Sequence, residues 1–167
     1  MILAIDPGNI NSAYVLLDEK LNIIEFGKFC NDNVRVETRR LFKKYYPVRV
    51  AIEMVASYGM AVGKEVFETC VWIGRFAELF EGYTTFIYRK DEKINLCSSM
   101  KAKDTNIRQA LIDRFARFDF KRGKGTKNNP DFFYGVSADV WQAIAVGVTY
   151  SDMFLEKGDK YERWTVF

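Results

Sequence analysis

An acidic residue ends, interrupts or precedes each of three apolar segments that lie far apart in this chain. Asp6 follows Met-Ile-Leu-Ala-Ile, Glu53 stands inside Val-Arg-Val-Ala-Ile-Glu-Met, and Asp139 lies in the first turn of the apolar segment that begins at Val140. A carboxylate at the mouth of a buried element costs on the order of several kcal/mol to desolvate unless a cation or donors compensate it. The fold must therefore supply compensation at three places, and one converging site for a hard divalent metal would do so.

Each acid also has a simpler explanation when it is taken alone. Asp139 near a helix start can stabilise the helix dipole by up to about 1 kcal/mol, and Asp6 before Pro-Gly can favour a turn. Glu53 is harder to explain in this way, because an acid contradicts the pattern of a buried strand. Since all three explanations would have to hold together, we prefer a convergent acidic site.

Length and composition indicate a single globular domain over residues 1–167. Hydrophobic residues make up 49% of the chain and charged residues 28%, which excludes a disordered chain. No apolar run approaches the roughly 20 residues that a membrane helix needs, and the N-terminus lacks a signal-peptide pattern, so no membrane association is expected. The three cysteines form no CxxC pair, which disfavours disulfides and structural zinc and favours the cytoplasm.

Histidine is absent from the sequence, and this narrows the possible chemistry. A Ser-His-Asp triad, a Cys-His pair and every His-ligated metal site are excluded. Whatever reaction the chain carries out must therefore depend on carboxylates and lysines.

Basic residues are clustered, although the net charge is only +3. Any one cluster is as easily explained by a solvated surface, but the last combines charges of one sign with two glycines, which suits a loop that grips phosphates. We expect nucleic-acid contacts from these clusters: Arg89, Lys90, Lys101, Lys103, Lys121, Arg122, Lys124 and Lys127.

Apolar periodicity predicts strands in the first half of the chain and helices in the second. Strands are expected at 2–6, 12–18, 22–29, 48–54 and 84–89. Helices are expected at 34–45, 60–81, 104–117 and 137–154, with an open loop over 121–131. This order predicts an α/β fold, a five-stranded mixed sheet with helices on its faces.

The order of elements and acids resembles the ribonuclease H-like superfold, and within it the RuvC-type Holliday-junction resolvases, particularly those of phages. The motifs that carry the resemblance reach from the first strand to the final helix: Ala4-Ile-Asp-Pro-Gly-Asn9, Ala51-Ile-Glu-Met54, Ser57-Tyr-Gly-Met60, the stretch from Met100 to Leu111, and Gly135-Val-Ser-Ala-Asp-Val-Trp141. Asp-x-Gly alone also opens sugar kinases and actin-like ATPases. The ordered set of Asp, Glu and Asp with a lysine-bearing helix before the last acid is more specific.

The resemblance implies a site for two Mg²⁺ ions, which Mn²⁺ can replace. Asp6 would bridge both ions, and Glu53 and Asp139 would hold one side each. Gly8 would leave room for the scissile phosphate, and Lys101 or Lys103 would contact it.

One position departs from the family pattern. RuvC enzymes usually carry an acid or a histidine three residues before the final aspartate, and here that residue is Val136. Asp131, Ser137 and Gln142 are candidates to replace it, and Asp131 is the best of them chemically. The predicted metal ligands are therefore Asp6, Glu53, Asp139 and Asp131.

The predicted helix 60–81 is apolar on more than one face, including Phe67 and Trp72. One face would pack on the sheet, and the excess width suggests a second partner. In RuvC-like enzymes the corresponding helix builds a homodimer, which suits paired nicks on opposing strands. Tyr58 is a candidate to stack on a base at the branch point, although its spacing differs from the family and simple packing also explains it.

These features together predict a homodimeric, Mg²⁺-dependent endonuclease that acts on branched DNA and leaves 5′-phosphate ends. Three alternatives stay open. A non-catalytic branched-DNA-binding protein is permitted by the missing fourth acid, and a nuclease for structured RNA would use the same superfold. An actin-like nucleotide-binding module would need further glycine-rich phosphate loops and a longer chain.

Overall fold

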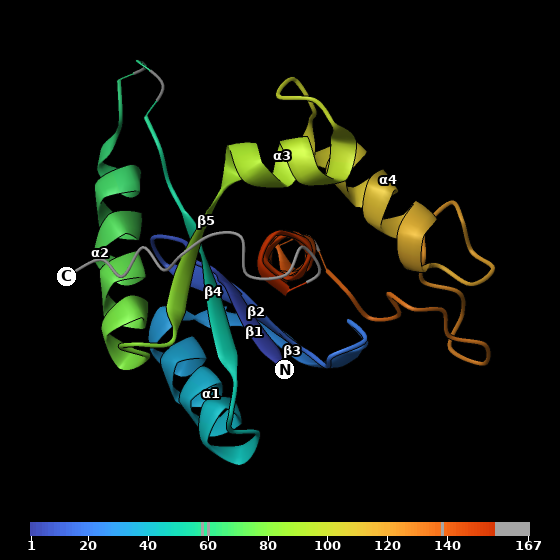
Figure 1. Cartoon of the computed structure of the whole chain (residues 1–167), viewed down its shortest axis with the longest axis horizontal. Helices are drawn as coiled ribbons and strands as arrows, with labels where there is room; N and C mark the ends of the chain where they lie inside the picture. Colours follow the sequence, from blue (N-terminus) through green and yellow to red (C-terminus); the bar gives the residue numbers. More distant parts are fainter. Residues whose placement is uncertain (58, 60, 138, 156–167) are drawn as a thin grey trace.

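A computed structural model describes residues 1–57, 59, 61–137 and 139–155. Figure 1 shows the chain from its blue N-terminus to its red last helix. The elements are β1 (Ile2–Asp6), β2 (Asn11–Leu17), β3 (Ile23–Cys30), α1 (Asn31–Lys44), β4 (Arg49–Met54), α2 (Lys64–Leu79), β5 (Thr84–Tyr88), α3 (Arg89–Cys97), α4 (Asp104–Phe115), α5 (Val140–Tyr150) and the π-helical turn η1 (Ser151–Leu155).

The strands form one mixed sheet in the order β3-β2-β1-β4-β5. β1, β2 and β3 are an antiparallel meander, whereas β4 and β5 join it in parallel to β1. Helices cover both faces, with α1 and α2 on one side and α5, α3 and α4 on the other (Figure 1). The predicted α/β fold with a five-stranded mixed sheet flanked by helices is confirmed.

Alternation along the strands separates two cores. Leu3 and Ile5 point toward α1 and α2, whereas Ile2 and Ala4 join the core under α5. Gly147 lets α5 approach this second face closely, because a Cβ there would lie 3.1 Å from the Ala4 Cβ and 2.8 Å from the Leu17 Cδ1. The C-terminal half of α5 therefore packs closely against β1 and β2.

The helices differ from the predicted ones at several ends. α1 begins three residues earlier than expected, because the side chain of Asn31 bonds the turn after β1. α2 begins only at Lys64, after the extended residue Gly63. The helix α3 was not predicted, since its sequence is polar and its first turn follows β5 without a linker. Among the described helices, none is long and apolar enough to cross a membrane.

Candidate functional site

Asp6 and Glu53 lie next to each other because their strands are parallel neighbours. Ile5 of β1 is aligned with Ile52 of β4, so the following residue in each strand is an acid at the same edge of the sheet. Alternation points both carboxylates to the face that α5 covers, the face of Ala4 and its neighbours. The pairing of the first two predicted acids therefore follows from strand register.

The turn after Asp6 is fixed by a buried network. The Gly8 amide donates to Ser12 Oγ at 3.2 Å, Ser12 Oγ donates to Asn31 Oδ1 at 2.6 Å, and Asn31 Nδ2 donates to the Gly8 carbonyl at 2.9 Å. A Cβ at Gly8 would lie 2.3 Å from the Asn11 carbonyl oxygen, so only glycine fits this turn. These contacts hold the backbone that carries Asp6.

Asp139 reaches the site from the N-terminal end of α5. It occupies the N-cap position, yet its side chain makes no capping hydrogen bond. Its Oδ2 instead forms an ion pair with the Lys28 ammonium of β3, and both side chains are partly exposed. Its carboxylate therefore does not act as a helix cap, and it is paired with a lysine side chain instead.

Two residues of α3 complete the cluster, and sequence reasoning missed the role of both. Glu92 is fully buried, and its Oε2 accepts a hydrogen bond from Arg89 Nη1 at 2.6 Å. The same nitrogen lies 2.5 Å from Gln142 Oε1 and 3.9 Å from Glu53 Oε1, and Arg89 Nη2 lies 2.5 Å from Asp104 Oδ1. Arg89, expected to bind DNA, thus lies among the acids as an internal counter-cation. The sequence did not indicate these contacts because it did not predict α3.

Burial and like charges make the site electrostatically unfavourable for carboxylates. Burial first, then the negative charge of Glu53 and a hydrogen bond to it, raise the pKa of Asp6 well above its usual range, with further contributions from Glu92 and Asp139. Burial and then Glu53 raise the pKa of Glu92 to about 9, although Arg89 opposes this. The four acids therefore act on one another across β1, β4, α3 and α5.

The donor chemistry suits a hard divalent cation. All four acids offer oxygen ligands, and Glu92 Oε1 is buried with no hydrogen-bond partner. Among the described residues, no three Asp, Glu, His or Cys side chains stand close enough together to hold an ion as they are arranged. Arg89 and Lys28 form ion pairs with these acids instead. The four acids therefore fit a metal ion when these two side chains move away from them.

The candidates for the missing fourth ligand lie in different places. Val136 is fully buried in the core under α5, where an acid would face apolar neighbours. Ser137 is exposed, and Gln142 bonds Arg89 inside the cluster. Asp131 accepts hydrogen bonds from the backbone N–H groups of four residues: Arg117, Phe118, Asp119 and Phe132. Its assignment as a metal ligand stays a prediction, and these bonds give it a structural role in the loop.

The remaining basic residues border the site or lie on a separate loop. Lys101 and Lys103 are exposed just before α4, whose first residue Asp104 bonds Arg89, so they lie near the rim of the acidic cluster. Lys90 is exposed on α3, with its Nζ 5.8 Å from the centre of the Tyr88 ring. Tyr58 lies outside the described residues.

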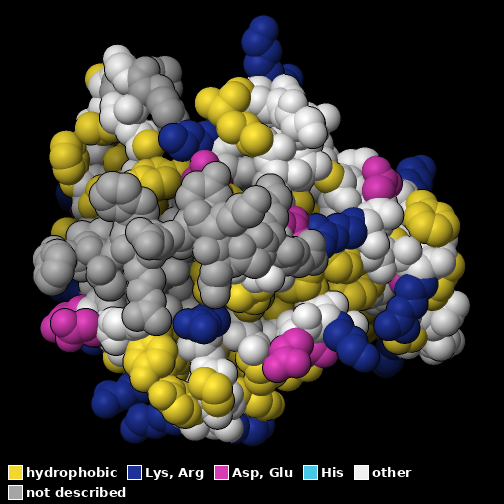
Figure 2. Space-filling view, in the orientation of Figure 1, with side chains coloured by type: hydrophobic (Ala, Val, Ile, Leu, Met, Phe, Trp, Pro, Cys, Tyr) yellow, Lys and Arg dark blue, Asp and Glu magenta, His cyan; other side chains and the backbone are white. Residues whose placement is uncertain are grey.

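The loop between α4 and α5 is well organised rather than open. Asp119 accepts the backbone N–H groups of Arg122, Lys124 and Gly125, and Gly125 pairs with Pro130. The loop displays exposed aromatic and basic side chains: Phe118, Phe120, Lys121, Arg122, Lys127 and Tyr134. Figure 2 shows lysine and arginine side chains with apolar ones between them on this side of the molecule. Such a surface suits a nucleic-acid backbone with unstacked bases.

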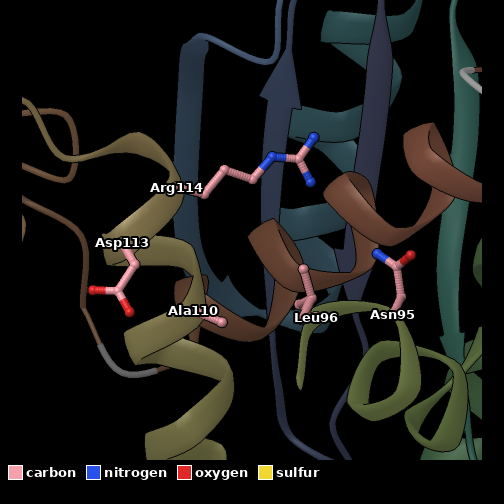
Figure 3. A pocket seen from close by; sticks show the side chains of 5 residues that line it. All are labelled: Asn95, Leu96, Ala110, Asp113 and Arg114. Atoms are coloured by element: carbon pink, nitrogen blue, oxygen red, sulfur yellow. The ribbon is translucent and has the colours of Figure 1, made fainter. Parts of the chain in front are cut away.

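A hollow between α3 and α4 lies away from the acids. Asn95, Leu96, Ala110, Asp113 and Arg114 line it (Figure 3). Arg114 forms two bonds to Asp152 at 2.7 and 2.9 Å, and Asn95 adds a third at 2.7 Å. These contacts tie both helices to η1, the turn that follows α5, so this hollow has a structural explanation.

Comparison with known proteins identifies the fold. No protein-family model matches the chain, and no curated protein is similar to it in sequence. The structure of Thermus thermophilus RuvC in complex with a Holliday junction substrate matches 90% of this chain and 92% of that one, with a TM-score of 0.59 and 12% identity. A second Thermus thermophilus RuvC structure matches 91% and 95%, with a TM-score of 0.59 and 14% identity. The chain therefore has the ribonuclease H-like fold of RuvC.

Proposed function

We propose that the chain is a metal-dependent endonuclease that cuts branched DNA, Holliday junctions and related forks, by paired nicks. The observation that carries this proposal is the convergence of Asp6, Glu53 and Asp139 at one edge of a sheet with the fold of RuvC. In support, one RuvC structure with this fold holds a Holliday junction. The further expectation of a phage-type enzyme of the cytoplasm stays a prediction.

The acids and the backbone divide the work of the proposed reaction. Two Mg²⁺ ions, when bound, supply activation of water and stabilisation of the leaving oxygen, and Mn²⁺ can replace them. Asp6, Glu53 beside it on β4 and Asp139 at the start of α5 would hold these ions. The turn at Gly8 holds Asp6 in place, and Lys101 and Lys103 at the rim would position the scissile phosphate. In-line attack by water would leave a 5′-phosphate and a 3′-hydroxyl.

The loop between α4 and α5 would hold the branch. Lys121, Arg122 and Lys127 are exposed on a backbone that Asp119 and Asp131 organise, and Lys124 is partly exposed beside them. Contacts from such side chains to phosphates fix position and carry little sequence information. The enzyme should therefore respond to the shape of DNA more than to its sequence.

A homodimer through α2 would place two sites on one junction. The outer face of α2 exposes Phe67 and Val71, at 61% and 54% of their surface. We expect Val71→Glu to shift the protein from dimer to monomer in analytical ultracentrifugation. Val36→Glu on α1 is the matched control, since Val36 is 65% exposed on another helix. A dimer that persists in Val71→Glu would contradict this interface.

Cleavage of an end-labelled four-way DNA junction tests the proposal directly. The expected result is paired nicks near the branch in Mg²⁺, none with chelator, and none in a linear duplex of the same sequence. Tight junction binding without a nick in Mg²⁺ or Mn²⁺ would instead indicate a non-catalytic binder. Faster cleavage of a structured RNA than of any branched DNA would indicate an RNA-processing nuclease.

A further inference from the structure

We propose that Glu92 is the fourth acidic ligand of the metal site, brought from α3 in place of the family's acid at the position of Val136. This inference rests on the proposed metal-dependent function and names a residue that sequence comparison with the family would not select. Glu92 lies on a different element from Val136, and the two positions are 44 residues apart in the chain.

Arg89 links Glu92 to the acids of the sheet. A single nitrogen, Arg89 Nη1, lies 2.6 Å from Glu92 Oε2 and 3.9 Å from Glu53 Oε1. One cationic atom therefore already spans the two carboxylates. Because Glu53 is beside Asp6 on the neighbouring strand, a cation in this position would face oxygens from β1, β4 and α3 together.

The burial of Glu92 calls for a cation beyond Arg89. The side chain is fully buried, and its Oε1 has no hydrogen-bond partner among the described residues. An unsatisfied buried carboxylate oxygen is costly, and Arg89 occupies only the other oxygen. If Glu92 only bound Arg89, the desolvation of Oε1 would stay uncompensated. A hard metal ion would use Oε1 as a ligand.

Arg89 would then hold the acids in the metal-free protein. Its Nη2 bonds Asp104 on the exposed start of α4, so the guanidinium has a second anchor outside the cluster. A metal between Glu92 and Glu53 would displace Nη1 while the bond to Asp104 remains. A metal ion bound by Asp139 would likewise displace the Lys28 ammonium from its carboxylate.

Titration of the purified protein with Mn²⁺ alone, followed by calorimetry and by the electron paramagnetic resonance of free Mn²⁺, tests the assignment. We expect Glu92→Gln to lose one of two bound ions or to bind it at least about tenfold more weakly. Glu19→Gln, in the exposed turn after β2, should bind as the wild type does. Melting in chelator separates the roles: a metal ligand predicts that Glu92→Gln is at least as stable as the wild type, because a neutral amide costs less to bury beside Glu53 than a carboxylate does.

Three results would overturn the assignment. Wild-type Mn²⁺ binding by Glu92→Gln, together with lost binding by Asp6→Asn, would show that Glu92 only pairs with Arg89 and would leave the proposed function standing. Unchanged binding by both variants would overturn the metal-dependent function as well. If Glu92→Gln does not fold, Glu92→Asp replaces it, which keeps the charge and withdraws the carboxylate by one methylene. Wild-type affinity in Glu92→Asp would also overturn the assignment.

Discussion

Two groups of carboxylates in this fold respond to their surroundings in opposite ways. At the sheet edge, burial and mutual repulsion raise the pKa of Asp6 and of Glu92. In the loop after α4, burial acts against Asp131, yet four backbone N–H groups outweigh it and lower the pKa to about 2. The hydrogen bond from the Gly125 amide is the main cause of the lowered pKa of Asp119.

The difference lies in what compensates each charge. The loop acids receive several fixed backbone donors, so their ionised form is stable and organises the chain around it. Among the described residues, Glu92 and Asp139 at the sheet edge are compensated by the side-chain cations Arg89 and Lys28 rather than by a set of backbone donors. A carboxylate with fixed donors is part of the structure, whereas one that lacks them is suited to bind a cation from solution.

The largest expected effect separates the two groups by activity. Asp6→Asn should reduce junction cleavage by on the order of 10³-fold or more, because it removes a ligand shared by both proposed ions. Junction binding should stay the same or become tighter, since a charge that repels phosphate is lost. Cleavage assays and gel shifts measure both effects, with Asp32→Asn on the exposed start of α1 as the control. Retained cleavage would contradict the assignment of Asp6.

The second prediction concerns a loop acid, whose loss should lower the stability of the fold. Asp131→Asn should lower the melting temperature by several degrees, because an amide cannot accept four backbone N–H bonds with comparable strength. Thermal unfolding measures this, and Asp113→Asn on the exposed face of α4 is the matched control. A melting temperature equal to that of the wild type would mean that the loop does not depend on this carboxylate.

The pH dependence of stability should distinguish the groups without any substitution. Glu92 binds its proton more tightly in the folded protein, so in chelator its contribution should decrease as pH rises from about 4.5 to about 9. Asp131 has a lowered pKa, so its contribution should be present above about 3.8 and be lost as pH falls toward 2. Denaturant unfolding across pH measures both slopes. Glu92→Gln should reduce the decrease in unfolding free energy between about pH 4.5 and about pH 9. An unchanged decrease in this variant would contradict its assignment to Glu92.

The smallest expected effect concerns the surface that the loop acids support. Lys127→Ala should weaken junction binding a few-fold and reduce the slope of log affinity against log salt by about 1, as expected for one lost phosphate contact. Lys43→Ala, at the exposed end of α1 on the other face of the sheet, should change neither quantity. Equal effects of the two substitutions would remove the loop from the proposed DNA surface.

The local pattern of apolar and acidic residues determined the strands and the fold class of this protein. Apolar runs predicted all five strands, and three acids at the mouths of apolar segments predicted a converging site. The parallel pairing of β1 with β4 then accounts for the neighbouring positions of Asp6 and Glu53. The fold class followed from the same order of elements, and the structural match to RuvC agrees with it.

Only the tertiary structure decided the rest of the candidate site. Nothing in the polar sequence Arg89-Lys-Asp-Glu indicated that Glu92 is fully buried or that Arg89 faces inward, because α3 owes its position to packing against α4 and α5 rather than to its own apolar pattern. Likewise, the sequence made Asp131 a candidate metal ligand in a loop expected to be open, and only the tertiary structure shows the backbone N–H groups that bond it. Sequence determines which acids are present, whereas long-range packing decides which of them receive donors and which are left to bind a cation.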